Sequence, residues 1–156
     1  FMNCDHSMLF YRFYREPKIV LSLFKERLKT VIVINLLPTT VLALILAILL
    51  YLSGGTTNPL NYIIIILSII SMSIFFSIHN LVLYYLLQPY NIGMEMKSTT
   101  YTIASIITYW ACYYISKIEV STFIFGIIMI IFVILYSIIS LILIYYYAPK
   151  TFKLKN

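Results

Sequence analysis

The two histidines and the acidic and thiol groups near them are the residues of this chain best suited to chemistry. His6 follows Cys4 and Asp5, but three adjacent ligand-type residues without a second pair elsewhere form a weak metal motif. His79 stands beside Asn80 at the end of a run of Ile, Leu and Phe. There a neutral imidazole could serve as the general base of an intramembrane enzyme or bond to a neighbouring helix. Chemistry on lipid or isoprenoid phosphates would also need metal-binding carboxylates, so we expect the bond to a helix.

Other signatures of catalysis or disulfide bonding are absent from the sequence. There is no Gly-rich phosphate loop followed by Lys-Ser/Thr, and no G-x-S-x-G turn around a nucleophilic serine. Cys4 and Cys112 alone do not make a disulfide framework. We therefore predict that the chain is not an enzyme and has no catalytic residue, metal or cofactor.

The composition predicts an integral membrane protein. Hydrophobic residues make up 62% of the 156 residues and charged residues only 10%, whereas a soluble domain carries about 25% charged residues. The mean hydropathy is +0.98. Because so few polar side chains cannot cover a water-soluble globule, the expected partner is the lipid bilayer and not nucleic acid.

Four apolar stretches come near the roughly 20 residues that a membrane-spanning helix needs. Turn residues fill 53–59, Gln88-Pro89 ends the second stretch, and Ala148-Pro149 ends the fourth. The predicted fold class is all-α, an integral membrane bundle of four transmembrane helices preceded by an amphipathic interfacial helix. The bundle covers 31–148, and its predicted spans are 31–52, 62–87, 99–116 and 120–148.

The charged residues are distributed unevenly around this predicted bundle. No Asp, Glu, Lys or Arg lies inside a predicted span, which argues against a self-contained ion-driven transporter. Of the 11 Lys and Arg residues, only Lys117 falls on the side opposite the termini, which leaves ten on the other side. The positive-inside rule makes that side cytoplasmic. We expect a multi-pass protein of the cell membrane with both termini inside, including a basic tail at 149–156.

The segment 1–30 differs from the spans because it is charged. Within it, Glu16–Lys29 is predicted to be a helix with Pro17 in its first turn, where proline is tolerated. With residues about 100° apart, one face is basic and the other apolar. The basic stripe consists of Lys18, Ser22, Lys25 and Lys29, and the apolar face of Val20, Phe24 and Leu28, with Arg27 among them. We interpret the helix as lying on the inner membrane surface, either as a charged anchor or as a docking element for a cytoplasmic partner through its lysines.

Neutral polar residues recur inside the spans at helical spacing. Such residues are typical of helix–helix contacts in lipid, because they allow close approach and interhelical hydrogen bonds. The alternative is that one stripe lines a substrate path. The candidates are Asn35 and Thr39 in the first span and Ser73, Ser77, Asn80, Tyr84 and Gln88 in the second, with His79 outside that stripe. Further stripes are Ser98, Thr102, Ser105, Tyr109, Cys112 and Ser116 in the third span and Gly126, Met129, Val133, Ser137 and Ser140 in the fourth.

Two stretches resemble segments of large bacterial membrane proteins, the ABC exporter permeases of the ABC-2 type. They are NCDHSMLFYRFYREPKIVLSLFKERLKTVIVINLLP (Asn3–Pro38) and HNLVLYYLLQPYNIGMEMKSTTY (His79–Tyr101). The resemblance implies the transmembrane part of a permease that moves its substrate with ATP hydrolysed by a separate ATP-binding cassette subunit. In such permeases a cytoplasmic amphipathic helix precedes the first span and touches the ATPase, and Glu16–Lys29 occupies that place. They usually have six or more spans, so four spans imply either a fragment of a longer permease or a protein of another family. The expected partners include further subunits in a homo- or hetero-oligomer.

The sequence is also compatible with a second function, of a different class. The chain could be a small membrane scaffold or assembly factor without a transport path. A neighbouring gene for an ATP-binding cassette protein would favour the exporter, and a gene that stands alone would favour the scaffold.

Overall fold

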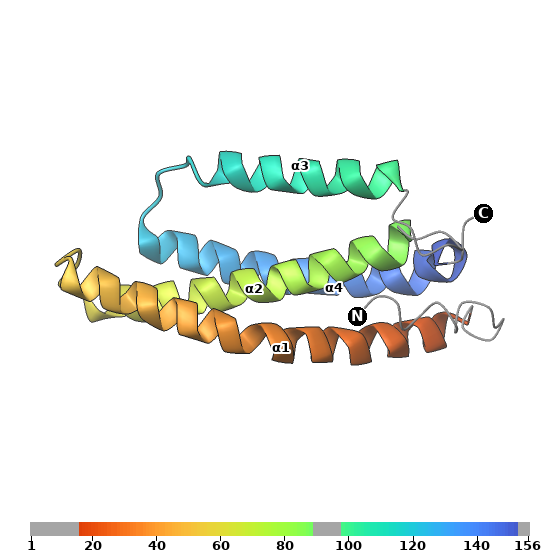
Figure 1. Cartoon of the computed structure of the whole chain (residues 1–156), viewed down its shortest axis with the longest axis horizontal. Coiled ribbons are helices and arrows are strands. Elements are labelled where there is room, and N and C mark those ends of the chain that lie inside the picture. Colours follow the sequence, from red (N-terminus) through yellow and green to blue (C-terminus); the bar gives the residue numbers. More distant parts are fainter. Residues whose placement is uncertain (1–15, 89–97, 153–156) are drawn as a thin grey trace. The chain divides into compact units, whose positions relative to one another are not determined.

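The computed structural model describes residues 16–88 and 98–152, most of which lie in helices (Figure 1). No strand occurs in this described part, so the all-α prediction is confirmed there. The helices are α1 (Pro17–Leu52), α2 (Pro59–Leu87), α3 (Thr99–Ile115) and α4 (Thr122–Thr151).

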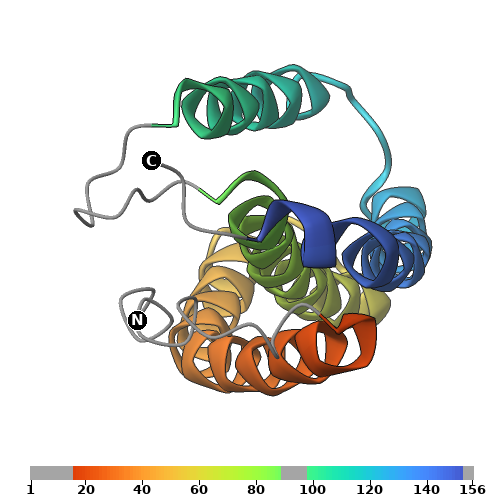
Figure 2. The same cartoon turned by 90° about the vertical axis from the view of Figure 1, so that its right-hand side faces the viewer.

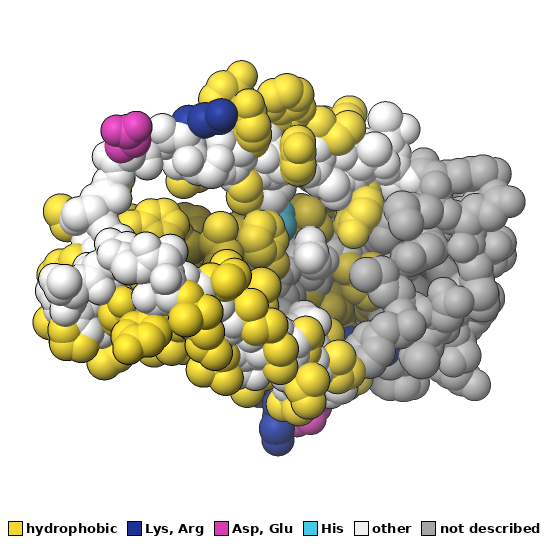
Figure 3. Space-filling view, turned by 60° about the vertical axis from the view of Figure 1, so that its left-hand side comes forward, with side chains coloured by type: hydrophobic (Ala, Val, Ile, Leu, Met, Phe, Trp, Pro, Cys, Tyr) yellow, Lys and Arg dark blue, Asp and Glu magenta, His cyan; other side chains and the backbone are white. Residues whose placement is uncertain are grey.

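Three of these helices, α1, α2 and α4, are long and apolar enough to cross a membrane. They contain 36, 29 and 30 residues, whereas a span needs about 20. Helix α3 has only 17 residues. Large apolar side chains of all four helices are exposed, and they cover much of the surface in Figure 3. Such a surface requires lipid or another protein around it, which indicates a multi-pass membrane protein.

The turn between α1 and α2 follows the residues that predict it. Helix α1 ends at Leu52, and Gly54 then has a φ of 65°, a left-handed conformation that only glycine adopts freely. Asn58 caps the next helix, because its Oδ1 accepts a hydrogen bond from the N–H of Leu60 at 3.0 Å. The other end of α2 is also where it is expected, at Leu87.

Several boundaries differ from the prediction. Helix α2 begins at Pro59, three residues before the predicted span, and α4 begins at Thr122, two residues after its predicted start. Glu16–Lys29 is not a separate interfacial helix, because α1 begins at Pro17 and continues through Lys29 into the apolar span. Residues 30 and 31 are Thr and Val, and neither stops a helix. Helix α4 does not end at Ala148-Pro149 but runs to Thr151. A proline in the last turn removes a single backbone donor, which a long helix tolerates.

The chain divides into two compact units. Figure 2 shows the helices from their ends. The first unit covers 1–26, 79–118 and 139–156, and the second covers 27–78 and 119–138. In the first unit four of the nine buried apolar residues are aromatic. Its buried apolar residues are Val20, Phe24, Leu81, Val82, Tyr84, Tyr85, Ile144, Ala148 and Phe152. Those of the second unit are Ala43, Phe75, Ile78 and Val133.

Candidate functional site

A ladder of polar side chains joins α1 to α2 in the second unit. Asn35 Nδ2 donates a hydrogen bond to Ser77 Oγ at 3.0 Å, and Thr39 Oγ1 donates one to Ser73 Oγ at 2.8 Å. Each helix supplies two residues four positions apart. The earlier residue of α1 bonds to the later residue of α2, and the later residue of α1 bonds to the earlier residue of α2. We call these four residues the polar ladder. It brings together four of the predicted candidates.

The geometry of the polar ladder favours packing over a substrate path. Ser77 Oγ accepts from Asn35 and donates to the Ser73 carbonyl at 2.8 Å, so its donor is used within the helices. In lipid, where no water replaces a lost bond, such interhelical bonds each stabilise by about 0.5 to 2 kcal/mol. The ladder is therefore a reason for α1 and α2 to stay together in the membrane.

Close packing between α4 and α2 also lies in the second unit. A Cβ at Gly126 would collide with Cγ2 of Ile64 and lie 3.1 Å from Ser68 Oγ, so only glycine permits this approach. Further along, the ring of Phe75 lies 5.3 Å from Phe132. The stripe predicted on the fourth span faces inward: Gly126, Val133 and Ser140 are buried, and Met129 and Ser137 are half-buried.

His79 has a partner on α3 within the first unit. Its Nε2 lies 2.9 Å from Thr108 Oγ1, and that hydroxyl donates to the Ala104 carbonyl at 2.9 Å. The imidazole is therefore bonded to a neighbouring helix through Nε2.

The face of helix α3 that is partly buried differs from the predicted one. It has no buried residue, and its half-buried positions are Tyr101, Ala104, Thr108 and Cys112. Of the predicted stripe, only Ser98 and Cys112 are half-buried, and Thr102, Ser105, Tyr109 and Ser116 are exposed. The hydroxyls of Thr102, Ser105 and Ser116 bond to backbone carbonyls three or four residues earlier, for example Ser105 Oγ to the Tyr101 carbonyl at 3.0 Å. Hydroxyls satisfied in this way do not need to face a neighbouring helix.

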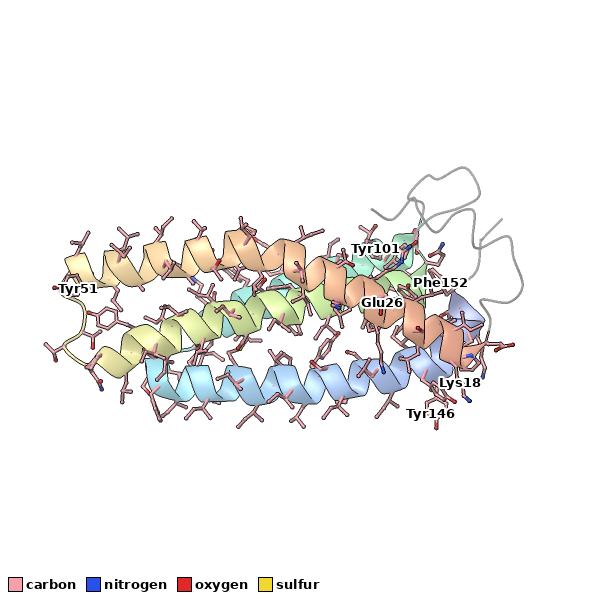
Figure 4. The ribbon with its side chains drawn as sticks, turned by 90° about the horizontal axis from the view of Figure 1, so that it is seen from below. Lys18, Glu26, Tyr51, Tyr101, Tyr146 and Phe152 are labelled. Atoms are coloured by element: carbon pink, nitrogen blue, oxygen red, sulfur yellow. The ribbon has the colours of Figure 1, made fainter. Side chains whose placement is uncertain are left out.

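An aromatic cluster fills the core of the first unit. The ring of Tyr85 stacks on Phe152 at 4.4 Å and meets the edge of Phe24 at 5.4 Å, and Tyr84 lies 5.6 Å from Phe152. Thr151 Oγ1 adds a bond to the Tyr85 carbonyl at 3.4 Å. The cluster connects the first part of α1 to the ends of α2 and α4. Figure 4 labels Phe152 at the end of α4.

The remaining predicted residues of α2 do not form one site. Tyr84 is buried in the aromatic cluster, whereas Asn80 is exposed. Gln88 is 1% exposed, with a left-handed φ of 38°, and its Oε1 has no hydrogen-bond partner among the described residues. The predicted stripe from Ser73 to Gln88 therefore separates into a ladder, an exposed amide and a buried helix end.

The first part of α1 has the two faces that its sequence predicts. Val20 and Phe24 are fully buried, and Lys18, Lys25 and Lys29 are exposed. Lys18 and Glu26 are labelled on this part of the helix in Figure 4. The lysines are thus accessible to a partner, and the apolar face is occupied by the aromatic cluster.

The sequence missed the aromatic cluster, although one signal was present. Phe152 lies in the predicted tail 149–156, where a large apolar residue follows Pro149 among lysines. Over the described ranges no group of three His, Cys, Asp or Glu residues could hold a metal. Cys4, Asp5 and His6 lie outside those ranges.

Comparisons with protein-family models, with curated proteins and with solved structures found no match to this chain. The class that the fold defines is a helical protein with three membrane-spanning candidates, and its function is argued below from its own residues.

Proposed function

We propose that this chain is the membrane-spanning part of an ABC-type exporter permease, in which a separate ATP-binding cassette subunit hydrolyses the ATP. The chain itself performs no chemistry. It lies in the cell membrane with four spans and both termini in the cytoplasm. The observation that carries the proposal is α1, a single helix with exposed lysines on one end and an apolar span on the other.

The fourth crossing is supported by the direction of α2 and α4. In the second unit, Ile64 of α2 meets Gly126 of α4, and further along both helices Phe75 meets Phe132. The two helices therefore run parallel, which supports a return crossing by the chain between them. Helix α3 lies in that connection, and its 17 residues are at the lower limit of about 17 to 25 for a span.

The orientation is supported by charge. All but one of the 11 basic residues lie on the side of the termini in a four-span chain, and cytoplasmic loops of membrane proteins carry that excess. Lys117, the exception, lies with its Nζ 5.1 Å from the centre of the Tyr113 ring, which stabilises a cation outside.

The docking of the ATPase is assigned to the exposed lysines of α1. Helix α1 continues without a break from Lys29 into the apolar stretch that follows it. The aromatic cluster holds the same end of α1 to α2 and α4 through Phe24, Tyr85 and Phe152. A displacement at the lysines would therefore also reach these two helices.

Crosslinking tests the proposal. In a chain with Cys4→Ser and Cys112→Ser, single cysteines replace Lys18, Lys25 or Lys29, and the ATP-binding cassette protein of a neighbouring gene is co-expressed. Lys18→Cys is expected to crosslink to the ATPase. The control is Leu52→Cys, which is 74% exposed at the other end of the same helix and is expected not to react. Absence of a crosslink from all three lysine positions would disprove the docking.

A membrane scaffold without a transport path is the second candidate, and the polar ladder favours it. The hydroxyl and amide groups of Asn35, Thr39, Ser73 and Ser77 bond to one another and do not line a path. The absence of a neighbouring ATP-binding cassette gene, together with stable recovery of the chain in complex with another membrane protein, would support the scaffold.

A further inference from the structure

Helix α3 has two faces of different character within the first unit. The half-buried residues of the helix lie on one side, and they are Tyr101, Ala104, Thr108 and Cys112. At about 100° per residue, a second group shares a sector of about 60° that is centred about 130° away around the helix. This group, which we call the Ile–Trp face, consists of Ile103, Ile107, Trp110 and Tyr114, each at least 50% exposed.

The chemistry of the Ile–Trp face changes in one direction along the helix. The aliphatic side chains of Ile103 and Ile107 come first, and the rings of Trp110 and Tyr114 follow. Lys117, which is also exposed, comes just after the end of the helix at Ile115. Hydrocarbon, headgroups and water follow one another in the same order across half a bilayer. A protein interface instead places apolar residues at its centre and polar residues around them, so the order on α3 favours lipid.

Trp110 is the centre of a group of exposed rings. Its ring centroid lies 6.2 Å from Tyr109, 5.9 Å from Tyr113 and 6.0 Å from Tyr114. Each of these rings carries a hydroxyl or an indole N–H that can bond to a headgroup while its apolar part contacts acyl chains. The helix rises about 6 Å from Trp110 to Tyr114, and each interfacial layer of a bilayer is about 5 to 8 Å thick. The rings therefore fit within one interfacial layer.

We infer that the rings of Tyr109, Trp110, Tyr113 and Tyr114 bind the headgroup layer of a phospholipid bilayer and fix the depth of α3 in the membrane. Lys117 contributes to this anchor, because its Nζ lies 5.1 Å from the centre of the Tyr113 ring and an ammonium there can bond to lipid phosphates. Such rings oppose movement in both directions, since the apolar part avoids water and the polar group avoids hydrocarbon.

The depth of the single tryptophan of the chain, Trp110, tests this inference without any substitution. The purified chain is reconstituted in phosphatidylcholine vesicles that contain lipid brominated near the headgroup, midway along the acyl chain or at its end. Quenching of the tryptophan fluorescence by each lipid gives the depth. Trp110 is expected about 15 Å from the bilayer centre, half of the hydrocarbon thickness of about 30 Å. Lipid brominated nearest the headgroup should therefore quench it most strongly.

Ile103→Trp combined with Trp110→Phe is the matched control, because it moves the tryptophan along the same face of the helix. The two positions are separated by about 10 Å along the helix axis, so the tryptophan of this variant is expected about 10 Å deeper. Lipid brominated at the end of the acyl chain should quench this variant most strongly.

The inference rests on the crossing of α3 in the proposed function and not on the ATPase, and the two failures give different results. Equal depths of Trp110 and of the tryptophan in the control variant would overturn the crossing and the anchor together. Strongest quenching of Trp110 by bromine at the chain end, with a different depth in the control variant, would disprove the anchor alone. Absence of quenching of Trp110 by every brominated lipid would show that another protein chain covers the face and would also disprove the anchor.

Discussion

At the scale of residues, the polar groups of the spans differ in how they are satisfied. Ser77 Oγ both accepts from Asn35 and donates to a carbonyl, and Thr108 Oγ1 bonds both to His79 and to the Ala104 carbonyl. A hydroxyl that both accepts and donates a hydrogen bond leaves no polar hydrogen unpaired in lipid, where an unpaired polar group costs free energy. These groups therefore stabilise contacts between helices and need no substrate to explain their presence.

The polar ladder gives the prediction that belongs to this scale. Asn35→Ala is expected to lower the free energy of unfolding by about 0.5 to 2 kcal/mol, because the Ser77 acceptor loses its donor. Denaturation in lipid–detergent mixtures would measure this change. The matched control is Thr40→Ala, because Thr40 Oγ1 bonds only to the Leu37 carbonyl of its own helix. Equal effects of the two variants, or additive effects of Asn35→Ala and Ser77→Ala, would contradict a stabilising interhelical bond.

At the scale of elements, different interactions hold the helices together in each of the two units. The second unit is joined by hydrogen bonds and a close glycine contact, as in helices that meet within lipid. The first unit has the buried rings of Phe24, Tyr84, Tyr85 and Phe152.

Phe24→Ala tests the aromatic cluster. A fully buried phenylalanine replaced by alanine costs about 3 to 5 kcal/mol, because transfer energy is lost and a cavity remains. Leu37→Ala, at a position that is 72% exposed, is the control and is expected to cost far less. Thermal unfolding of both variants in the same detergent would show the difference. Similar melting temperatures for the two would mean that the cluster does not hold α1.

The attachment of α3 is tested at His79. Since α3 has no buried residue, loss of the His79–Thr108 bond is expected to raise amide hydrogen exchange in 99–115 by about threefold to tenfold. His79→Ala and Thr108→Val should have the same effect, and the double variant should add nothing. Ser105→Ala is the control, since that hydroxyl bonds within α3. Unchanged exchange in His79→Ala would contradict the role given to this histidine.

Much of this architecture could be predicted from the sequence, because strong turn residues separate long apolar stretches. Gly54 and Pro59 limit α1 and α2 as expected. The continuity of α1 was not predicted, since a change from charged to apolar residues suggested a boundary although no residue there breaks a helix. The pairing of Asn35 with Ser77 could not be predicted either, because the sequence shows a polar stripe on each helix but not how the two stripes align.

The exposed face of α3 could not be predicted from the sequence, for a different reason. Periodic hydroxyls are as typical of a contact face as of a face whose hydroxyls bond to their own backbone. Thr102 and Ser105 belong to the second kind. Phe152 was overlooked because lysines surround it, and only the packing against Tyr85 reveals its place in a core.

At the scale of the whole molecule, the account depends on how often the chain crosses the membrane. In the proposal, four crossings place both ends of the chain and the lysines of α1 on the cytoplasmic side. The proposal gives the crossing between α2 and α4 to α3, the shortest helix of the described part. The proposed docking of an ATPase at the lysines of α1 depends on that topology.

Labelling of single cysteines in intact cells tests this topology most directly. In the Cys4→Ser and Cys112→Ser background, a membrane-impermeant maleimide is expected to label Thr57→Cys and Glu119→Cys from outside, and Ser98→Cys only after lysis. Labelling of Ser98→Cys and Glu119→Cys from the same side would show that α3 does not cross. Labelling of Thr57→Cys only after lysis would invert the orientation, and either result would contradict the account.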